Sequence, residues 1–126
     1  MNIIICGAGR VGFTIAKLLS EQKHSITVID QSSEDIEKIK DSLDVNAIVG
    51  KATYPLILEK ANASDADMII AVTRNDEINM LICQIAYTVF KINKKIAIEY
   101  NGVIIQKIKE DIWIQDIPHG CLLHQR

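Results

Sequence analysis

The feature that most constrains this chain is an apolar run leading directly into three closely spaced glycines. Residues 3–6 read Ile-Ile-Ile-Cys, and residues 7–12 read Gly-Ala-Gly-Arg-Val-Gly. In such a strand-to-helix motif, Gly7 permits the tight turn, Gly9 lets the backbone approach a pyrophosphate, and Gly12 lets the helix pack closely on the sheet. The free N–H groups at the start of the helix favour phosphate. The motif predicts a nucleotide-binding unit; the alternative is a glycine turn without a ligand.

A second apolar run ends in a carboxylate that fits the same motif. Residues 26–29 read Ile-Thr-Val-Ile and are followed by Asp30 and Gln31. An acidic residue at the end of the second strand can accept hydrogen bonds from the ribose hydroxyls of an adenosine. Asp30 would repel a 2′-phosphate, and residues 31–33 offer no arginine to receive one. We therefore expect NAD(H) to be preferred over its 2′-phosphorylated form.

Apolar periodicity along the chain predicts an α/β fold. The expected strands are residues 3–6, 26–29, 45–49, 68–72 and 96–98, and the expected helices are residues 10–22, 33–43, 55–61 and 76–90. Ser32 and Thr53 are placed to cap the second and third helices. Because helical crossovers favour parallel pairing, we predict a single-domain, Rossmann-type, doubly wound parallel sheet with strand order 3-2-1-4-5.

The clear alternation of strands and helices stops after residue 98. Residues 103–108 are compatible with one more short helix, and residues 112–114 with a possible sixth strand. We expect the nucleotide-binding domain to occupy residues 1–115 and residues 116–126 to form a poorly ordered tail. His119, Cys121 and His124 are potential metal ligands in that tail, but no fourth ligand is apparent, so we predict no metal site.

Composition and charge exclude several functional classes. The 126 residues are 48% hydrophobic and 24% charged, which is ordinary for one globular domain and too short for a two-lobed enzyme. A net charge of −2 gives no case for nucleic acid as a partner. The apolar runs fall far short of the ~20 residues needed to cross a bilayer, and no signal peptide is recognisable. We expect a cytoplasmic protein without direct membrane insertion, whose three cysteines are reduced thiols.

Four loops are expected to meet at the carboxyl edge of the sheet, where open α/β sheets bind ligands. His24 falls in a turn at the opposite edge, which makes it a surface residue rather than a catalyst. The arginines at positions 10 and 74 are also compatible with solvated charges. We predict no catalytic residue in the four loops, and the predicted cofactor-binding residues are Gly7, Ala8, Gly9, Arg10, Val11, Gly12, Asp30, Gln31, Lys51, Ala52, Thr53, Thr73 and Arg74.

Two further segments make the pattern more specific. Residues 50–53 read Gly-Lys-Ala-Thr, and residues 66–73 read Ala-Asp-Met-Ile-Ile-Ala-Val-Thr and continue into Asp-Glu-Ile-Asn-Met at 76–80. With the glycine motif, they resemble the RCK/KTN family of nucleotide-binding domains, and most closely the regulatory TrkA-type subunits of potassium uptake systems. The resemblance covers residues 1–98. The chain departs from it at Lys51, where many relatives are acidic, and at Glu99, where many are basic.

The resemblance implies a regulatory domain that performs no chemistry on its ligand. The ligand would be NAD(H), with ATP or ADP as alternatives. By position, the glycines and Arg10 would hold phosphate, Asp30 the ribose, and Ala52 with Thr53 would border the adenine. The resemblance also implies a homodimer or larger assembly. Its partner would be a membrane potassium transporter subunit, through which the domain is peripherally associated with the membrane and which it gates by ligand-dependent conformation or assembly.

Two other functions stay open at this point. The chain could be the cofactor-binding part of an NAD-dependent oxidoreductase. Hydride transfer needs an acid or base near the nicotinamide, for which the histidines are poorly placed, although the carboxyl-edge loops hold Lys51 and Glu77. It could also be a remnant scaffold without a ligand. Apolar residues near the end of the chain predict a dimer interface if the sheet does not cover them, namely Val103, Ile104, Ile108, Ile112, Trp113 and Ile114.

Overall fold

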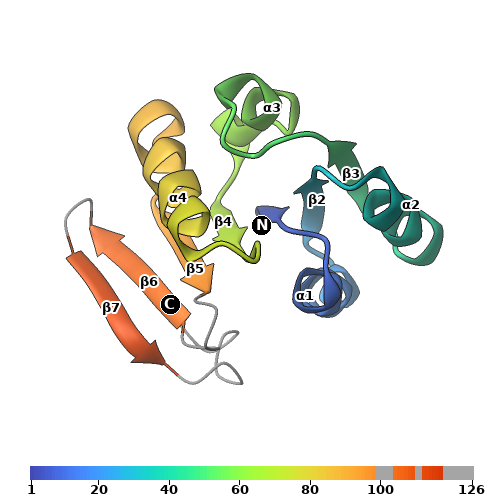
Figure 1. Cartoon of the computed structure of the whole chain (residues 1–126), viewed down its shortest axis with the longest axis horizontal. Coiled ribbons are helices and arrows are strands. Elements are labelled where there is room, and N and C mark those ends of the chain that lie inside the picture. Colours follow the sequence, from blue (N-terminus) through green and yellow to red (C-terminus); the bar gives the residue numbers. More distant parts are fainter. Residues whose placement is uncertain (99–103, 110–111, 118–126) are drawn as a thin grey trace.

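The computed structural model describes residues 1–98 in full, together with the backbone of two later strands at 104–109 and 112–117. Its sheet has the strand order β3-β2-β1-β4-β5-β6-β7 (Figure 1). The first five strands pair in parallel, which confirms the predicted order 3-2-1-4-5. They are β1 (Asn2–Cys6), β2 (Ser25–Asp30), β3 (Asn46–Val49), β4 (Met68–Ala71) and β5 (Lys94–Ile98).

Helices cover both faces of the parallel sheet (Figure 1). Helices α1 (Arg10–Glu21) and α2 (Ser33–Ser42) lie on one face, and α3 (Pro55–Lys60) and α4 (Asp76–Phe90) lie on the other. A short 3-10 helix, η1 (Ala63–Asp65), precedes β4.

Alternation along the strands builds a core on each face. In β1, Ile3 and Ile5 pack towards α1 and α2, whereas Ile4 and Cys6 pack towards α3 and α4. The central strands therefore read as continuous apolar runs, because both of their faces are covered.

The helices that follow β2 and β4 begin with side-chain caps. Ser32 Oγ accepts a hydrogen bond from the N–H of Asp35 at 3.1 Å, as predicted, and the Asn75 side chain accepts one from the N–H of Ile78 at 2.9 Å. The prediction that Thr53 caps α3 is wrong: the helix follows Tyr54, whose side chain makes no capping hydrogen bond. Pro55 fits this uncapped start because it has no N–H to satisfy.

The chain after β5 differs from the prediction. Residues 104–109 form strand β6 (Ile104–Lys109), antiparallel to β5, and not a helix; β7 (Ile112–Ile117) is antiparallel to β6. The helical interpretation relied on apolar residues four positions apart, but that spacing also places residues on one face of a strand. The predicted sixth strand is thus the seventh, and it continues past residue 115. The rest of the predicted tail, with its three potential metal ligands, lies outside the described residues.

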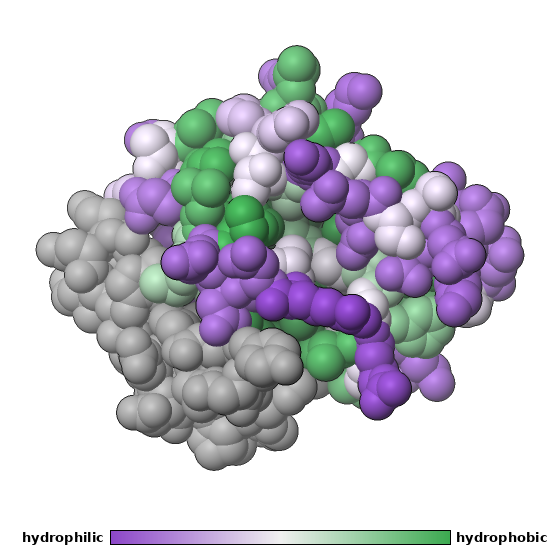
Figure 2. All heavy atoms as spheres, in the orientation of Figure 1, coloured by the Kyte–Doolittle hydropathy of each residue, from purple (hydrophilic) through white to green (hydrophobic). Residues whose placement is uncertain are grey.

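The surface is polar over α2 and partly apolar over α3 and α4 (Figure 2). Exposed charged side chains on α2 include Glu37, Lys38 and Asp41. By contrast, Leu56 of α3 and Leu81 of α4 are 67% and 46% exposed. Among the residues that the structure describes, no helix is long and apolar enough to cross a membrane.

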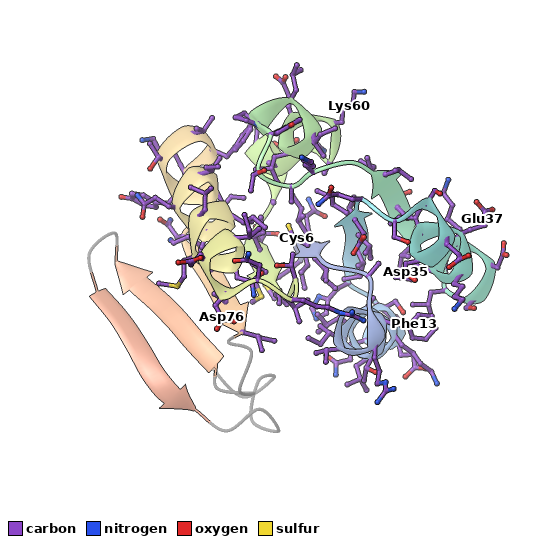
Figure 3. All side chains as sticks on the ribbon, in the orientation of Figure 1. Cys6, Phe13, Asp35, Glu37, Lys60 and Asp76 are labelled. Carbon is purple, nitrogen blue, oxygen red and sulfur yellow. The ribbon has the colours of Figure 1, made fainter. Side chains whose placement is uncertain are left out.

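Two of the three cysteines are buried free thiols, as predicted. Cys6 lies among the central strands, while Glu37 and Lys60 point outward (Figure 3). Burial raises the pKa of the Cys6 thiol well above its usual range, and the nearby Cys83 and Asp30 add to the rise. The Cys6 thiol is therefore neutral and poorly nucleophilic. The third cysteine, Cys121, is outside the described residues.

Candidate functional site

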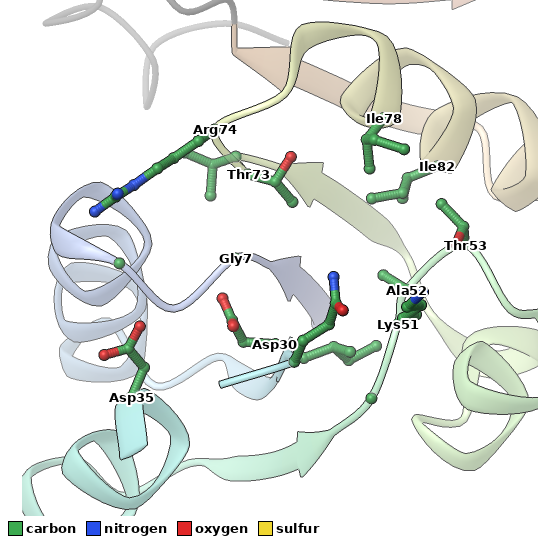
Figure 4. A pocket seen from close by; sticks show the side chains of 15 residues that line it. Gly7, Asp30, Asp35, Lys51, Ala52, Thr53, Thr73, Arg74, Ile78 and Ile82 are labelled. Carbon is green, nitrogen blue, oxygen red and sulfur yellow. The ribbon is translucent and has the colours of Figure 1, made fainter. Parts of the chain in front are cut away.

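A pocket of about 470 Å³ lies at the carboxyl edge of the parallel sheet (Figure 4). It is formed by the loops that follow β1, β2, β3 and β4 and by the first turns of α2 and α4. This is the edge at which the sequence predicts the four loops to meet. The pocket brings together nine of the predicted site residues: Gly7, Gly9, Asp30, Gln31, Lys51, Ala52, Thr53, Thr73 and Arg74.

The other four predicted site residues do not line the pocket. Ala8 and Gly12 are buried, Val11 packs against the core, and Arg10 is exposed at the start of α1. A Cβ atom at Gly12 would overlap the carbonyl oxygen of Gly7. Gly12 therefore permits the close approach of helix and strand, and this segment shapes the loop rather than the pocket wall.

Gly7 and Gly9 serve the glycine loop (residues 7–12) in different ways. Gly7 has a φ of +124°, and a Cβ atom there would lie 2.7 Å from the carbonyl oxygen of Val72. A Cβ atom at Gly9 would have nothing within 4 Å. The positive φ at residue 7 and its closeness to Val72 thus require glycine. By contrast, the space beside Gly9 is open to a ligand at the start of α1.

Asp30 joins the glycine loop to the loop that follows β2. One carboxylate oxygen accepts a hydrogen bond from the N–H of Ala8 at 2.7 Å, and the other accepts one from the N–H of Ser32 at 2.8 Å. A carboxylate offers about four acceptor positions, so these two bonds leave capacity for a ligand hydroxyl. Asp30 is therefore both a support of the loop and part of the pocket wall.

A second carboxylate, that of Asp35, also lines the pocket beside Asp30 (Figure 4). Asp35 is not among the site residues predicted from the sequence. The signal that could have identified it is its position three residues after the Ser32 cap, directly beyond the carboxyl end of β2. Two carboxylates on one side of the pocket make it unfavourable for an additional phosphate.

The opposite side of the pocket is apolar. Ile78 and Ile82 project from successive turns of α4 and face Ala52 and Thr53 of the loop after β3 (Figure 4). Neither isoleucine was predicted as a site residue, because their helical spacing is equally typical of core packing. Beside this wall, Lys51 Nζ lies 5.6 Å from the centre of the Tyr54 ring, and both residues are exposed. Such a wall can hold a flat, apolar ring system.

Asn79 holds the loop after β4. Its Oδ1 accepts hydrogen bonds from the N–H and the hydroxyl of Thr73 at 2.9 and 2.6 Å, and its Nδ2 donates to the carbonyl oxygens of Thr73 at 3.1 Å and Ile98 at 2.8 Å. The Asn79 side chain is buried, with 1% of the residue exposed. In the sequence, Asn79 stands out only as part of the family pattern, because nothing local predicts its partner on β5.

Arg74 follows Thr73 and is exposed. Its side chain extends from the loop after β4 across the mouth of the pocket towards the start of α1 (Figure 4). The guanidinium group therefore lies on the side of the pocket where the glycine loop offers backbone N–H groups. Both features favour an anion.

Two residues weighed in the sequence analysis lie away from the pocket. His24 is at the opposite edge of the sheet, where its Nδ1 lies 3.1 Å from the terminal amino group of Met1. Glu77 is exposed on α4 and does not line the pocket. Within the described part of the chain, no group of three or more His, Cys, Asp or Glu side chains is arranged to hold a metal ion.

Comparison with known proteins shows the family to which the chain is similar. A family model described as the TrkA-N domain matches residues 3–115. The Trk system potassium uptake protein TrkA of Halomonas elongata is 44% identical over 97 residues, which are 77% of this chain and 21% of that protein. The protein of the same name from Haemophilus influenzae is 41% identical over 123 residues, which are 98% of this chain and 27% of that protein. The chain thus spans about a quarter of the length of these relatives.

Solved structures share the fold. The TrkA-N domain of the inner membrane protein ybaL from Escherichia coli has a TM-score of 0.72 at 22% identity, covering 78% of this chain and 72% of that one. The GsuK channel bound to NAD has a TM-score of 0.68 at 19% identity, covering 78% and 18%. The yeast reductase Gre2 complexed with NADPH has a TM-score of 0.63 at 12% identity, covering 82% and 39%. The shared arrangement confirms the predicted Rossmann-type fold, which by itself does not separate binding modules from enzymes.

Proposed function

Because the chain belongs to the TrkA-N domain family, we propose that it is a regulatory nucleotide-binding module of a potassium transport system, with residues 1–115 as the binding domain. The observation that carries the proposal is the pocket at the carboxyl edge, where the glycine loop, Asp30 and the apolar wall face one space of about 470 Å³. The relatives named Trk system potassium uptake protein TrkA support the transport context.

The proposed ligand is NAD(H), with ATP or ADP as alternatives. Its phosphates would lie in the open space beside Gly9, at the start of α1. The adenosine ribose would bind the remaining acceptor positions of Asp30, and the adenine would lie against Ile78 and Ile82 near Ala52. The fold shared with the NAD-bound GsuK channel supports this choice.

We expect the pocket to prefer NADH over NADPH. A 2′-phosphate on the adenosine ribose would lie close to the carboxylates of Asp30 and Asp35, which both line the pocket. The negative charges of the phosphate and the carboxylates would repel each other, and the repulsion is stronger in a partly enclosed site than in bulk water. No arginine in residues 31–33 offsets it.

The module is proposed to sense its ligand without changing it. In an oxidoreductase, a positioned acid or base near the nicotinamide takes part in hydride transfer. Of the two candidates in the sequence, Glu77 lies outside the pocket, and Lys51 lines the pocket but has its amino group over the exposed Tyr54 ring. The alternative of an NAD-dependent oxidoreductase is kept as the outcome to be tested, since Gre2 has a similar fold.

The proposed partners are a second copy of the chain and a membrane potassium transporter subunit, with the module on the cytoplasmic side. Nucleotide binding can regulate such a partner only if the ligand has different affinities for two arrangements of the module. Sedimentation and small-angle scattering at micromolar concentration, with NADH, with ATP and without ligand, test this. A monomer with identical profiles in all three conditions would contradict both self-association and the switch.

Calorimetric titration with NADH, NADPH, ATP and ADP is the main test of the proposed function. We expect saturable binding of NADH, weaker binding of NADPH, and no oxidation of bound NADH followed at its absorbance band. Failure of all four nucleotides to bind would reject the nucleotide-binding proposal and favour a scaffold without a ligand. Steady oxidation of NADH with a carbonyl substrate would favour the enzyme.

A further inference from the structure

We propose that Asn79 is a positioning residue, which holds Arg74 where its guanidinium group can meet a phosphate bound beside Gly9. This inference rests on the proposed function, because it requires a nucleotide phosphate at the start of α1. It assigns to Asn79 a role in ligand affinity although its side chain is buried and does not line the pocket.

The Asn79 amide uses its full hydrogen-bonding capacity inside the protein. An amide side chain has two acceptor positions on its oxygen and two donors on its nitrogen. In Asn79 the oxygen accepts two hydrogen bonds and the nitrogen donates two. The group therefore has no capacity left for a ligand, and any effect on binding must pass through the groups that it holds.

Three of these four hydrogen bonds go to Thr73, the residue before Arg74. They engage the N–H, the carbonyl oxygen and the hydroxyl of Thr73, so the backbone is held on both sides of that residue. The fourth goes to the carbonyl oxygen of Ile98 at the end of β5. Since Asn79 itself lies in α4, the loop is fixed to two regular elements at once.

Thr73 is committed to the same arrangement. Its hydroxyl lies 2.6 Å from Asn79 Oδ1, and its oxygen accepts a hydrogen bond from the N–H of Asn75 at 3.2 Å. With its proton donated to Asn79, the hydroxyl is a poor donor for a ligand phosphate. The group of this loop that is free to meet an anion is the guanidinium of Arg74, which crosses the pocket mouth (Figure 4).

A held backbone makes an exposed arginine more effective. The planar guanidinium fork suits phosphate geometry, but a long side chain loses conformational freedom when it binds. If the loop backbone were also free, more freedom would be lost on binding and fewer conformations would place the fork over the glycine loop. Releasing Thr73 should therefore weaken the binding of phosphate groups and leave the adenosine contacts on the other side of the pocket unchanged.

The test compares ADP with adenosine, because only ADP carries the phosphates. We expect Asn79→Ala to weaken ADP binding by about five- to tenfold, as expected when a charge-assisted contact becomes poorly aligned. Adenosine binding should change by less than about twofold. If Asn79→Ala fails to fold, Thr73→Val removes the hydroxyl at nearly constant shape and should have the same effect in smaller degree.

A double-mutant cycle with Arg74→Ala separates positioning from general destabilisation. If Asn79 acts through Arg74, Asn79→Ala has little further effect on the ratio of ADP to adenosine affinity in the Arg74→Ala background. Equal losses for ADP and adenosine, or the same loss in both backgrounds, would overturn the inference while leaving the proposed function intact. Failure of the unmutated protein to bind any of NADH, NADPH, ATP and ADP would reject the proposed function, and this inference with it.

Discussion

Two neighbouring loops, the glycine loop and the loop after β4, border the pocket, and one side chain holds each of them. One carboxylate oxygen of Asp30 accepts a hydrogen bond from the N–H of Ala8 in the glycine loop, and the other accepts one from the N–H of Ser32 in the loop after β2. Asn79, which is 1% exposed, holds the loop after β4 with three hydrogen bonds to Thr73 and makes a fourth to Ile98 of β5. A side chain that holds a loop and keeps spare acceptor positions on the pocket wall can also bind a ligand. A buried side chain whose hydrogen-bonding groups are all used can only position its neighbours.

The two supports also join different parts of the fold. Asp30 ends β2 and reaches the loop after β1, so it ties together two neighbouring crossovers. Asn79 lies on the helix that follows its own loop and reaches the end of β5. A change at Asp30 should therefore alter ligand choice, and a change at Asn79 should alter the strength of phosphate binding.

The largest expected effect comes from filling the space that the glycine loop leaves open. Gly9→Val should weaken nucleotide binding by more than about a hundredfold, because its side chain would occupy the phosphate position. The domain should stay folded, since a Cβ atom at Gly9 meets nothing within 4 Å. Calorimetric titration together with thermal unfolding checks this. A folded variant with unchanged affinity would show that the ligand binds elsewhere.

Gly12→Ala is the matched opposite of that change. Here the added Cβ would overlap the carbonyl oxygen of Gly7, a backbone atom that cannot move without shifting β1 or α1. We expect a loss of about 3 kcal/mol or more in the free energy of unfolding, as is typical of overpacking against a rigid neighbour. Chemical denaturation measures it. A loss below about 1 kcal/mol would mean that helix α1 moves easily on the sheet.

Asp30→Ala should have an intermediate effect that separates the two supports. We expect NADH binding to weaken by about tenfold, because the ribose hydroxyls lose a charged acceptor and the N–H of Ala8 loses its partner. The preference for NADH over NADPH should narrow as well. Asn79→Ala is the comparison variant, in which that preference should be unchanged. Equal affinity of the unmutated protein for both cofactors would reject the ribose assignment.

The smallest effects are expected at the caps of the two helices that follow these loops. Ser32→Ala and Asn75→Ala each remove a side-chain acceptor from the first turn, of α2 and of α4 respectively. Each should lower the free energy of unfolding by about 1 kcal/mol. Ser33→Ala, at the exposed neighbouring position, is the control and should change it by less than about 0.5 kcal/mol. A larger loss in the control would mean that the caps are not what stabilises the helix start.

Local sequence patterns were enough to predict the central sheet and nine of the residues that line the pocket. The run at 3–6 and the glycines after it predict a buried strand and a tight turn without reference to the rest of the chain. Asp30 could be selected because strand, loop and helix recur in a fixed order, so the end of the second strand must lie beside the glycine loop. The long helix at 76–90 was predicted with its bounds, because it begins with acidic residues and its apolar face is wide.

The strand after β5 and the remaining pocket residues depended on contacts between distant segments. The spacing of Ile104 and Ile108 fits a helix as well as a strand, and pairing with the free edge of β5 decided between them. Ile78 and Ile82 line the pocket because α4 begins shortly after β4, at the carboxyl edge of the sheet.

By itself, the sequence determined the α/β class, the order of the parallel strands and the glycine loop, since each follows from the periodicity and steric limits of short segments. Only the tertiary structure decided which polar groups meet. The amide of Asn79 bonds to Thr73 in the loop before α4 and to Ile98 of β5. The two oxygens of Asp30 accept hydrogen bonds from two different loops. A buried polar side chain needs hydrogen-bond partners, and tertiary packing decides which groups lie within its reach. The sequence of any one segment therefore does not identify these partners.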